Sequence, residues 1–128
     1  MSEARILIVD DDPDMASVLG QLLESSGYKV SAVMDGEAAL QFLEKSFPDL
    51  VVADVMLPKM DGWKLCKKIK EDERTRAIPV LIVTGKSEEM DEIMSYESGA
   101  DGFIRKPFKN DEFVAAVENL LNGTSRKP

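Results

Sequence analysis

The sequence contains no histidine, and it has one cysteine, Cys66, among its 128 residues. Without histidine, imidazole is excluded as a general acid or base and as a metal ligand. A single thiol cannot form a disulfide within the chain, which fits a reducing compartment. No apolar run approaches the length of a membrane-spanning helix. Three aspartates at residues 10–12 interrupt the first apolar run, so the N-terminus lacks a signal-peptide pattern. We therefore expect a cytoplasmic protein without a membrane partner.

Positive charge is also scarce: the sequence has 16 lysines and arginines but 24 aspartates and glutamates, which gives a net charge of −8. This charge argues against direct binding to nucleic acid or to an anionic membrane surface. It favours a partner with a basic face, or a site where carboxylates surround a cation. The composition is otherwise that of a soluble globular protein, with 44% hydrophobic and 31% charged residues. A chain of this length fits one domain with one core.

Five short apolar runs alternate with segments of helical periodicity. The expected strands are residues 5–9, 29–33, 50–53, 79–83 and 102–104. The helices are expected between Asp12 and Gly27, between Asp35 and Pro48 with Phe47 on the apolar face, after Gly62, between Ser87 and Gly99, and between Asn110 and Gly123. This alternation predicts an α/β fold, a parallel sheet with helices on both faces.

Two of these elements differ from the rest in composition. Residues 29–33 are more polar than the other strands, so we expect them at an edge of the sheet. The fourth helix carries Met90, Ile93 and Met94 and few other large apolar residues. We therefore expect it to be the least firmly packed helix, with Ser87 as its N-cap.

Polar residues follow the strands where the strands end: Asp10 and Asp11, Asp54, Thr84 and Lys106. The carboxyl ends of parallel strands lie at one edge of a sheet, where such folds bind ligands. Carboxylates at close range raise each other's pKa unless a cation lies among them. Oxygen ligands favour Mg²⁺, or Mn²⁺ in its place, and the lack of nearby thiolate and imidazole disfavours zinc. A carboxylate beside such a metal can attack phosphorus, while Lys106 and Thr84 stabilise the phosphoryl oxygens.

These residues belong to four motifs that occur in order along the chain. The motifs are Val9-Asp10-Asp11; Asp54 with Met56, Pro58, Asp61 and Gly62; Val83-Thr84-Gly85; and Gly99-Ala100-Asp101 through Lys106-Pro107-Phe108. Over residues 5–121 the sequence resembles the receiver domain of bacterial two-component response regulators, and is similar to single-domain chemotaxis-type regulators. The resemblance implies a flavodoxin-like, doubly wound sheet of strand order 2-1-3-4-5 flanked by five helices. It places the receiver domain at residues 1–122 and a polar tail at 123–128.

The resemblance also implies a role for each site residue. Asp54 is the expected phosphoacceptor, charged by a histidine kinase or a phosphotransfer protein. Asp10, Asp11, Asp54 and the Met56 backbone carbonyl are the expected metal ligands. Lys106 is expected to pair with the phosphoryl group and to precede a cis bond to Pro107. The family's positions that influence dephosphorylation fall here on Met56 and Lys86.

Thr84 and the aromatic Phe103 are the switch pair that the resemblance implies. Their movement changes the surface around the fourth helix and fifth strand, which regulates a downstream protein or an output domain. Such a protein is no enzyme, apart from metal-dependent autophosphorylation from a phosphodonor and slow autodephosphorylation.

Two other functions compete with this interpretation. Asp10 and Asp12, two residues apart after a strand, are similar to the haloacid-dehalogenase-like phosphatases. Pro13 does not fit that family, however, and Asp12 is more simply a helix N-cap. A constitutive protein-binding module that has lost phosphorylation is the third possibility, although the complete set of site residues argues against it. Read alone, Phe103 and Trp63 are core residues, and the position of Trp63 after Asp61-Gly62 indicates that it lies near the site.

Overall fold

A computed structural model describes residues 3–85 and 88–123 of the protein. Strands and helices alternate along it. They are β1 (Arg5–Val9), α1 (Pro13–Ser25), β2 (Lys29–Val33), α2 (Gly36–Lys45), β3 (Leu50–Asp54), α3 (Gly62–Glu71), β4 (Val80–Thr84), α4 (Glu88–Ser98), β5 (Gly102–Arg105) and α5 (Asn110–Leu121). Lys86, the expected cap Ser87 and residues 124–128 of the expected tail lie outside the described residues. In the described part of the chain, every helix is too short or too polar to span a bilayer.

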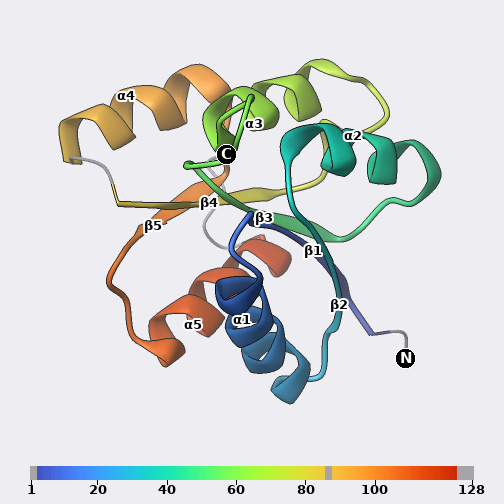
Figure 1. Cartoon of the computed structure of the whole chain (residues 1–128), viewed down its shortest axis with the longest axis vertical. Coiled ribbons are helices and arrows are strands. Elements are labelled where there is room, and N and C mark those ends of the chain that lie inside the picture. Colours follow the sequence, from blue (N-terminus) through green and yellow to red (C-terminus); the bar gives the residue numbers. More distant parts are fainter. Residues whose placement is uncertain (1–2, 86–87, 124–128) are drawn as a thin grey trace.

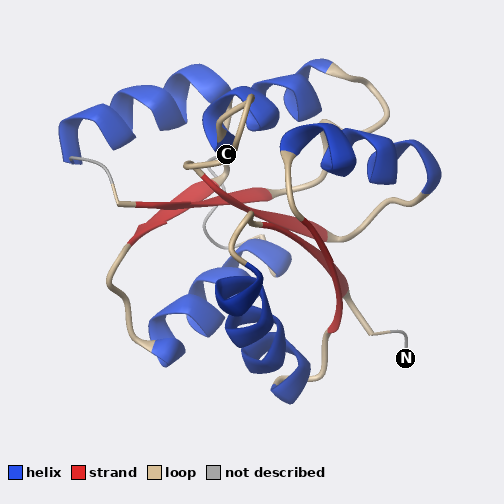
Figure 2. Ribbon diagram, viewed as in Figure 1, coloured by secondary structure: helices blue, strands red, loops and turns tan. Residues whose placement is uncertain are grey.

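The five strands form one parallel sheet in the order β2-β1-β3-β4-β5, which confirms the predicted topology. Helices α1 and α5 cover one face and helices α2, α3 and α4 cover the other, giving three layers (Figures 1 and 2). The order in which strands are added changes side at β1: β2 lies on one side of β1, and β3, β4 and β5 lie on the other. The carboxyl ends of β1 and β3 therefore flank the topological switch point, where such sheets bind ligands.

Continuous apolar runs make the central strands, because both faces of the sheet are covered. All five residues of β3 and all five of β4 are buried. Alternate side chains enter opposite layers: Val51 and Ala53 pack with α2 and α3, whereas Leu50 and Val52 pack with α1 and α5. The more exposed β2 lies at the edge, as its polarity predicts.

Aspartates begin three of the helices by accepting backbone N–H groups of the first turn. Asp12 accepts the N–H of Asp14 at 3.0 Å, so its role as the N-cap of α1 is confirmed. Asp35 caps α2, and Asp61 caps α3 by accepting the Lys64 N–H at 2.8 Å. The last of these caps fixes the chain directly after β3, and so helps to position the loop beside Asp54.

One helix ends earlier than the sequence predicts. Helix α2 ends at Lys45, and Phe47 lies outside it with 56% of its surface exposed, so placing Phe47 on the helix was wrong. Pro48 is the physical reason, because a proline disfavours the helical conformation of the residue before it. Ser46 is already extended, with φ −143° and ψ 145°.

The start of α5 is also displaced by one residue. Asn110, expected as the N-cap, is the first residue inside the helix, and Lys109 occupies the cap position. The Lys109 N–H donates to a carboxylate oxygen of Glu112 at 2.8 Å. A glutamate at the third helical position can cap the chain in this way, which removes the need for an aspartate or asparagine at the cap.

Candidate functional site

Asp54 and Lys106 meet at the carboxyl edge of the sheet, although 52 positions separate them in the chain. The Lys106 ammonium donates from Nζ to Asp54 Oδ2 at 3.0 Å. Asp54 is 6% exposed and ends β3. Lys106 follows β5, is held by its N–H to the Thr84 carbonyl at 2.8 Å, and precedes the expected cis bond to Pro107. The structure therefore places a lysine on the carboxylate predicted to be the nucleophile.

The second carboxylate at this edge is Asp10, which directly follows β1 and is 3% exposed. Its Oδ1 accepts the N–H of Asp12 at 2.9 Å. Burial raises the pKa of the Asp10 carboxyl, and the charge of Asp54 adds to the increase, whereas the Asp12 N–H lowers it. A buried carboxylate next to a second one is electrostatically destabilised, and a cation between them relieves this.

The oxygen atoms at this edge suit a cation that binds oxygen ligands and keeps most of its water. Among residues 3–85 and 88–123, no three histidine, cysteine, aspartate or glutamate side chains form a ready metal cluster. Asp11 is exposed, whereas Asp10 and Asp54 are close enough to interact electrostatically. The Met56 N–H donates to Asp54 Oδ1 at 3.0 Å, which places the Met56 peptide group beside the carboxylate. Mg²⁺ prefers few protein ligands and retains water, so these residues fit it.

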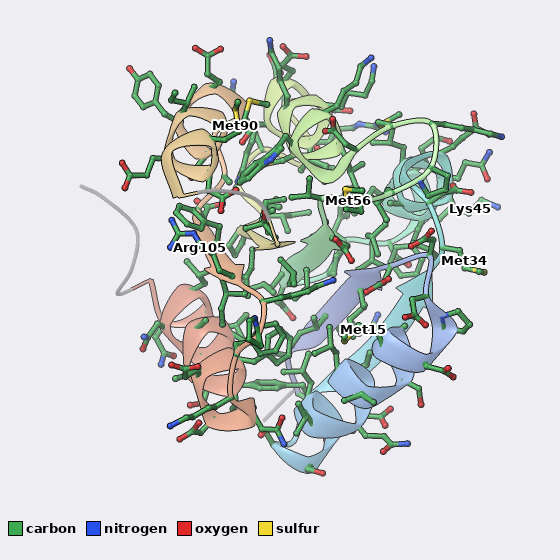
Figure 3. The ribbon with its side chains drawn as sticks, turned by 60° about the vertical axis from the view of Figure 1, so that its left-hand side comes forward. Met15, Met34, Lys45, Met56, Met90 and Arg105 are labelled. Carbon is green, nitrogen blue, oxygen red and sulfur yellow. The ribbon has the colours of Figure 1, made fainter. Side chains whose placement is uncertain are left out.

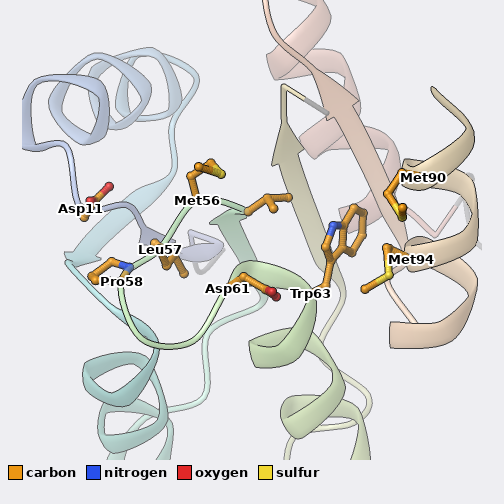
Figure 4. A pocket seen from close by; sticks show the side chains of 9 residues that line it. Asp11, Met56, Leu57, Pro58, Asp61, Trp63, Met90 and Met94 are labelled. Carbon is orange, nitrogen blue, oxygen red and sulfur yellow. The ribbon is translucent and has the colours of Figure 1, made fainter. Parts of the chain in front are cut away.

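A cavity of about 710 Å³ extends from this edge to α4. Its lining residues are Asp11, Val55, Met56, Leu57, Pro58, Asp61, Trp63, Met90 and Met94. The indole ring of Trp63 points toward Met90 and Met94 (Figure 4). Trp63 is therefore both a buried residue and a neighbour of the site, and its fluorescence can report on changes at this edge.

Thr84 ends β4 and is fully buried. Its hydroxyl donates to Asp91 Oδ1 on α4 at 3.0 Å. The other carboxylate oxygen of Asp91 accepts the Nε–H of Arg105 on β5, also at 3.0 Å. The structure thus directs the Thr84 hydroxyl toward α4, while Lys106 is the side chain that donates to Asp54.

Phe103 lies half-buried on β5 between Trp63 and Arg105. Its ring meets that of Trp63 edge-on, with centroids 6.5 Å apart and planes at 74°. The Arg105 guanidinium carbon lies 5.0 Å from the centroid of the Phe103 ring. This geometry is a cation–π contact. Figure 3 shows Arg105 on β5 beside α4, the helix that carries Met90.

Sequence reasoning missed Asp91 and Arg105. A signal was present, because Asp91, Ser95 and Ser98 recur at helical spacing and mark a polar, small-residue side of α4. That side faces inward, with Asp91 and Ser98 buried. Of the apolar residues expected on this helix, Met94 packs against the core, whereas Met90 and Ile93 are half or more exposed. The exposure agrees with the prediction that α4 is loosely packed.

The fold and this edge together define a class of phosphate-handling signalling domains, and comparison with known proteins identifies the class. The sequence model of the response regulator receiver domain matches residues 6–118, so the chain belongs to the receiver domain family of two-component response regulators. Domains of this family act as phosphorylation-controlled signalling switches and are not classical enzymes. The match leaves the phosphatase and the constitutive binding module without support.

Particular relatives agree with this membership. The chain is 42% identical to the DNA-binding dual master transcriptional regulator RpaA of Synechocystis over 97% of this chain and 52% of that protein. It is 41% identical, with a TM-score of 0.88, to the signal receiver domain of a histidine kinase from Syntrophus aciditrophicus, covering 98% of this chain and 95% of that one. A sensor kinase receiver domain from Pseudomonas aeruginosa, crystallised with magnesium in its active site cleft, is 28% identical with a TM-score of 0.86, covering 95% and 100%. The chain spans about half the length of the first curated relatives it matches.

Proposed function

We propose that Asp54 is the phosphoacceptor of this receiver domain and that Lys106 stabilises the phosphoryl group it receives. The contact between Lys106 Nζ and Asp54 Oδ2 carries this proposal. An ammonium already at the nucleophile neutralises charge that develops on the phosphoryl oxygens, without reorganisation at the moment of transfer. The Asp54 oxygen forms the new bond to phosphorus as the bond from phosphorus to the donor breaks, which leaves an acyl phosphate.

The cation that accompanies this step is Mg²⁺ in our proposal, with Mn²⁺ as a possible substitute. Asp10, Asp11, Asp54 and the Met56 carbonyl would hold it, and it would neutralise phosphoryl charge when bound. The raised pKa of Asp10 supports this ligand set, because a carboxylate destabilised by burial and by Asp54 gains from a cation. The Met56 and Asp12 N–H groups orient the two carboxylates by their hydrogen bonds.

The phosphodonor in this proposal is a histidine kinase or a phosphotransfer protein in the cytoplasm. The protein accelerates its own phosphorylation and, slowly, its own dephosphorylation, and has no other catalytic role. Thr84 and Phe103 form the switch pair that connects Asp54 to α4 and β5. That surface then regulates a downstream protein or an output domain, and the domain itself does not bind nucleic acid. Its net charge of −8 supports the last point.

Acetyl phosphate with Mg²⁺ tests the site directly. Wild-type protein is expected to gain the mass of one phosphoryl group, and Asp54→Asn is expected to gain none. Asp49→Asn is the matched control, since Asp49 is an exposed aspartate directly before the same strand, where it accepts the Arg5 N–H. Equal modification of wild type and Asp54→Asn would refute the assignment, as would an unmodified wild type.

A further inference from the structure

One ion pair holds both proposed switch residues. Asp91 on α4 accepts the Thr84 hydroxyl on one carboxylate oxygen and the Arg105 Nε–H on the other, each at 3.0 Å. The same Arg105 guanidinium stacks on the ring of Phe103. Thr84, Asp91, Arg105 and Phe103 therefore form a continuous chain of contacts from β4 through α4 to β5. We call these four residues the Asp91 latch.

Burial makes the two bonds of Asp91 important to the resting state. Asp91 is 0% exposed, whereas the side chain of Arg105 is 38% exposed. A buried carboxylate that loses a donor cannot replace it with water, unless the surrounding structure moves. Without Thr84, Asp91 Oδ1 would lose its donor, and only Oδ2 would keep its hydrogen bond, from Arg105.

The Thr84 hydroxyl has only one proton to donate. It can donate to Asp91 or to a phosphoryl oxygen on Asp54, and not to both at once. We propose that the Asp91 latch opposes phosphorylation: Asp91 holds the Thr84 hydroxyl in the resting arrangement, and capture of the hydroxyl by the phosphoryl group releases α4. This inference rests on the proposed phosphorylation of Asp54.

Release of α4 would alter the exposed surface of that helix. Ile93 and Tyr96 on the helix that carries Asp91 are 57% and 89% exposed. When Asp91 loses the Thr84 hydrogen bond, movement toward water lowers the free energy of its carboxylate. The exposed side chains of Ile93 and Tyr96 would move with the helix. The latch thus connects the event at Asp54 to the exposed face of α4.

Beryllofluoride, which mimics the phosphoryl group, provides an equilibrium test on the full chain with Mg²⁺. Asp91→Asn keeps the shape of the side chain but weakens its hydrogen bond to Thr84. It is expected to bind beryllofluoride about 10-fold more tightly than wild type, as the weakening of one charge-assisted bond implies. Trp63 fluorescence follows the titration. Glu92→Gln is the matched control, because it removes an exposed charge from the same helix, and it is expected to match wild type.

A double-mutant cycle separates the latch from a general charge effect. In a Thr84→Ala background, Asp91→Asn is expected to change the affinity by less than about 2-fold, because the hydroxyl that Asp91 holds is gone. An equal gain in that background would overturn the latch, and so would wild-type affinity in Asp91→Asn. If Asp91→Asn does not fold, Asp91→Ala replaces it with the same expectations. A wild type that does not bind beryllofluoride refutes the proposed function and the latch together.

Discussion

Gly62 is where a single methyl group should disturb the site most. A Cβ atom built on Gly62 would lie 2.3 Å from the Asp54 carbonyl oxygen and 3.1 Å from the Val55 Cα. Both neighbours are backbone atoms, which cannot rotate away as a side chain can. Gly62 also donates its N–H to the Val55 carbonyl at 3.0 Å, so the first turn of α3 is bound to the end of β3. We predict that Gly62→Ala displaces the backbone of Asp54.

The distance sets the size of the effect. The contact must open from 2.3 Å to at least 3.0 Å, which moves either the first turn of α3 or the end of β3. Overpacking of a buried site typically costs about 1–3 kcal/mol, and we expect Gly62→Ala to lower the free energy of unfolding by this amount. Catalytic positioning is more sensitive still, since a misplacement of about 1 Å can reduce a rate about 100-fold.

Urea denaturation and the initial rate of acetyl phosphate modification measure the two effects. Gly20→Ala is the matched control, because Gly20 is also buried in a helix but its Cβ would meet only Val30 Cγ1, at an ordinary 3.6 Å. We expect Gly20→Ala to raise stability by about 0.5–1 kcal/mol, as an alanine does inside a helix, and to leave the modification rate unchanged. If Gly62→Ala behaved like Gly20→Ala in both assays, the steric reasoning would be wrong.

Three further predictions concern buried and partly buried side chains. Asp10→Asn is expected to raise the urea midpoint in metal-free buffer, because it removes a buried charge beside Asp54, and a lower midpoint would contradict this. Burial raises the pKa of the Cys66 thiol from 9.0 to about 11, so its thiolate fraction at pH 8 is about 100-fold smaller. Iodoacetamide should therefore label Cys66 in urea but scarcely in the native protein, and rapid native labelling would refute its burial. Lys70→Met breaks the 2.7 Å ion pair with Asp101 at the amino end of β5. It should lower stability by about 1–3 kcal/mol without slowing acetyl phosphate modification, and slower modification would show coupling to the site.

The parallel sheet was predictable because two simple rules act together. Strands covered on both faces are apolar throughout, which distinguishes Ile6 to Val9 and Leu50 to Ala53 from the helices. The carboxyl ends of parallel strands share one edge, which predicts that Asp54 and Lys106 meet although they are far apart in sequence. The strand order itself came from family resemblance, since periodicity does not determine which strands are neighbours.

Gly62 and Asp91 could not be interpreted in the same way. In the sequence, a glycine after an aspartate indicates only a turn. The structure shows that the lack of a side chain at Gly62 leaves room for the backbone of Asp54. Asp91 lies in a helix whose larger side chains, Met90 and Ile93, suggest the buried side by their size. The structure buries the carboxylate instead, because Thr84 and Arg105 supply donors from two neighbouring strands. Periodicity within α4 marks its polar side, but it does not show that donors on other elements make that side the buried one.

This reversal in α4 explains why the helix suits a switch. A helix that buries Asp91 and exposes Ile93 and Tyr96 gains little from apolar burial, so its position depends on the bonds to Thr84 and Arg105. Hydrogen bonds, unlike buried area, can be transferred to a new partner in a single step. An element held mainly by such bonds lies near the low-stability end of the fold, from which moving parts are drawn. A more apolar inner face would anchor α4 more firmly, and the loss of the Thr84 bond would then be too small a change to move it.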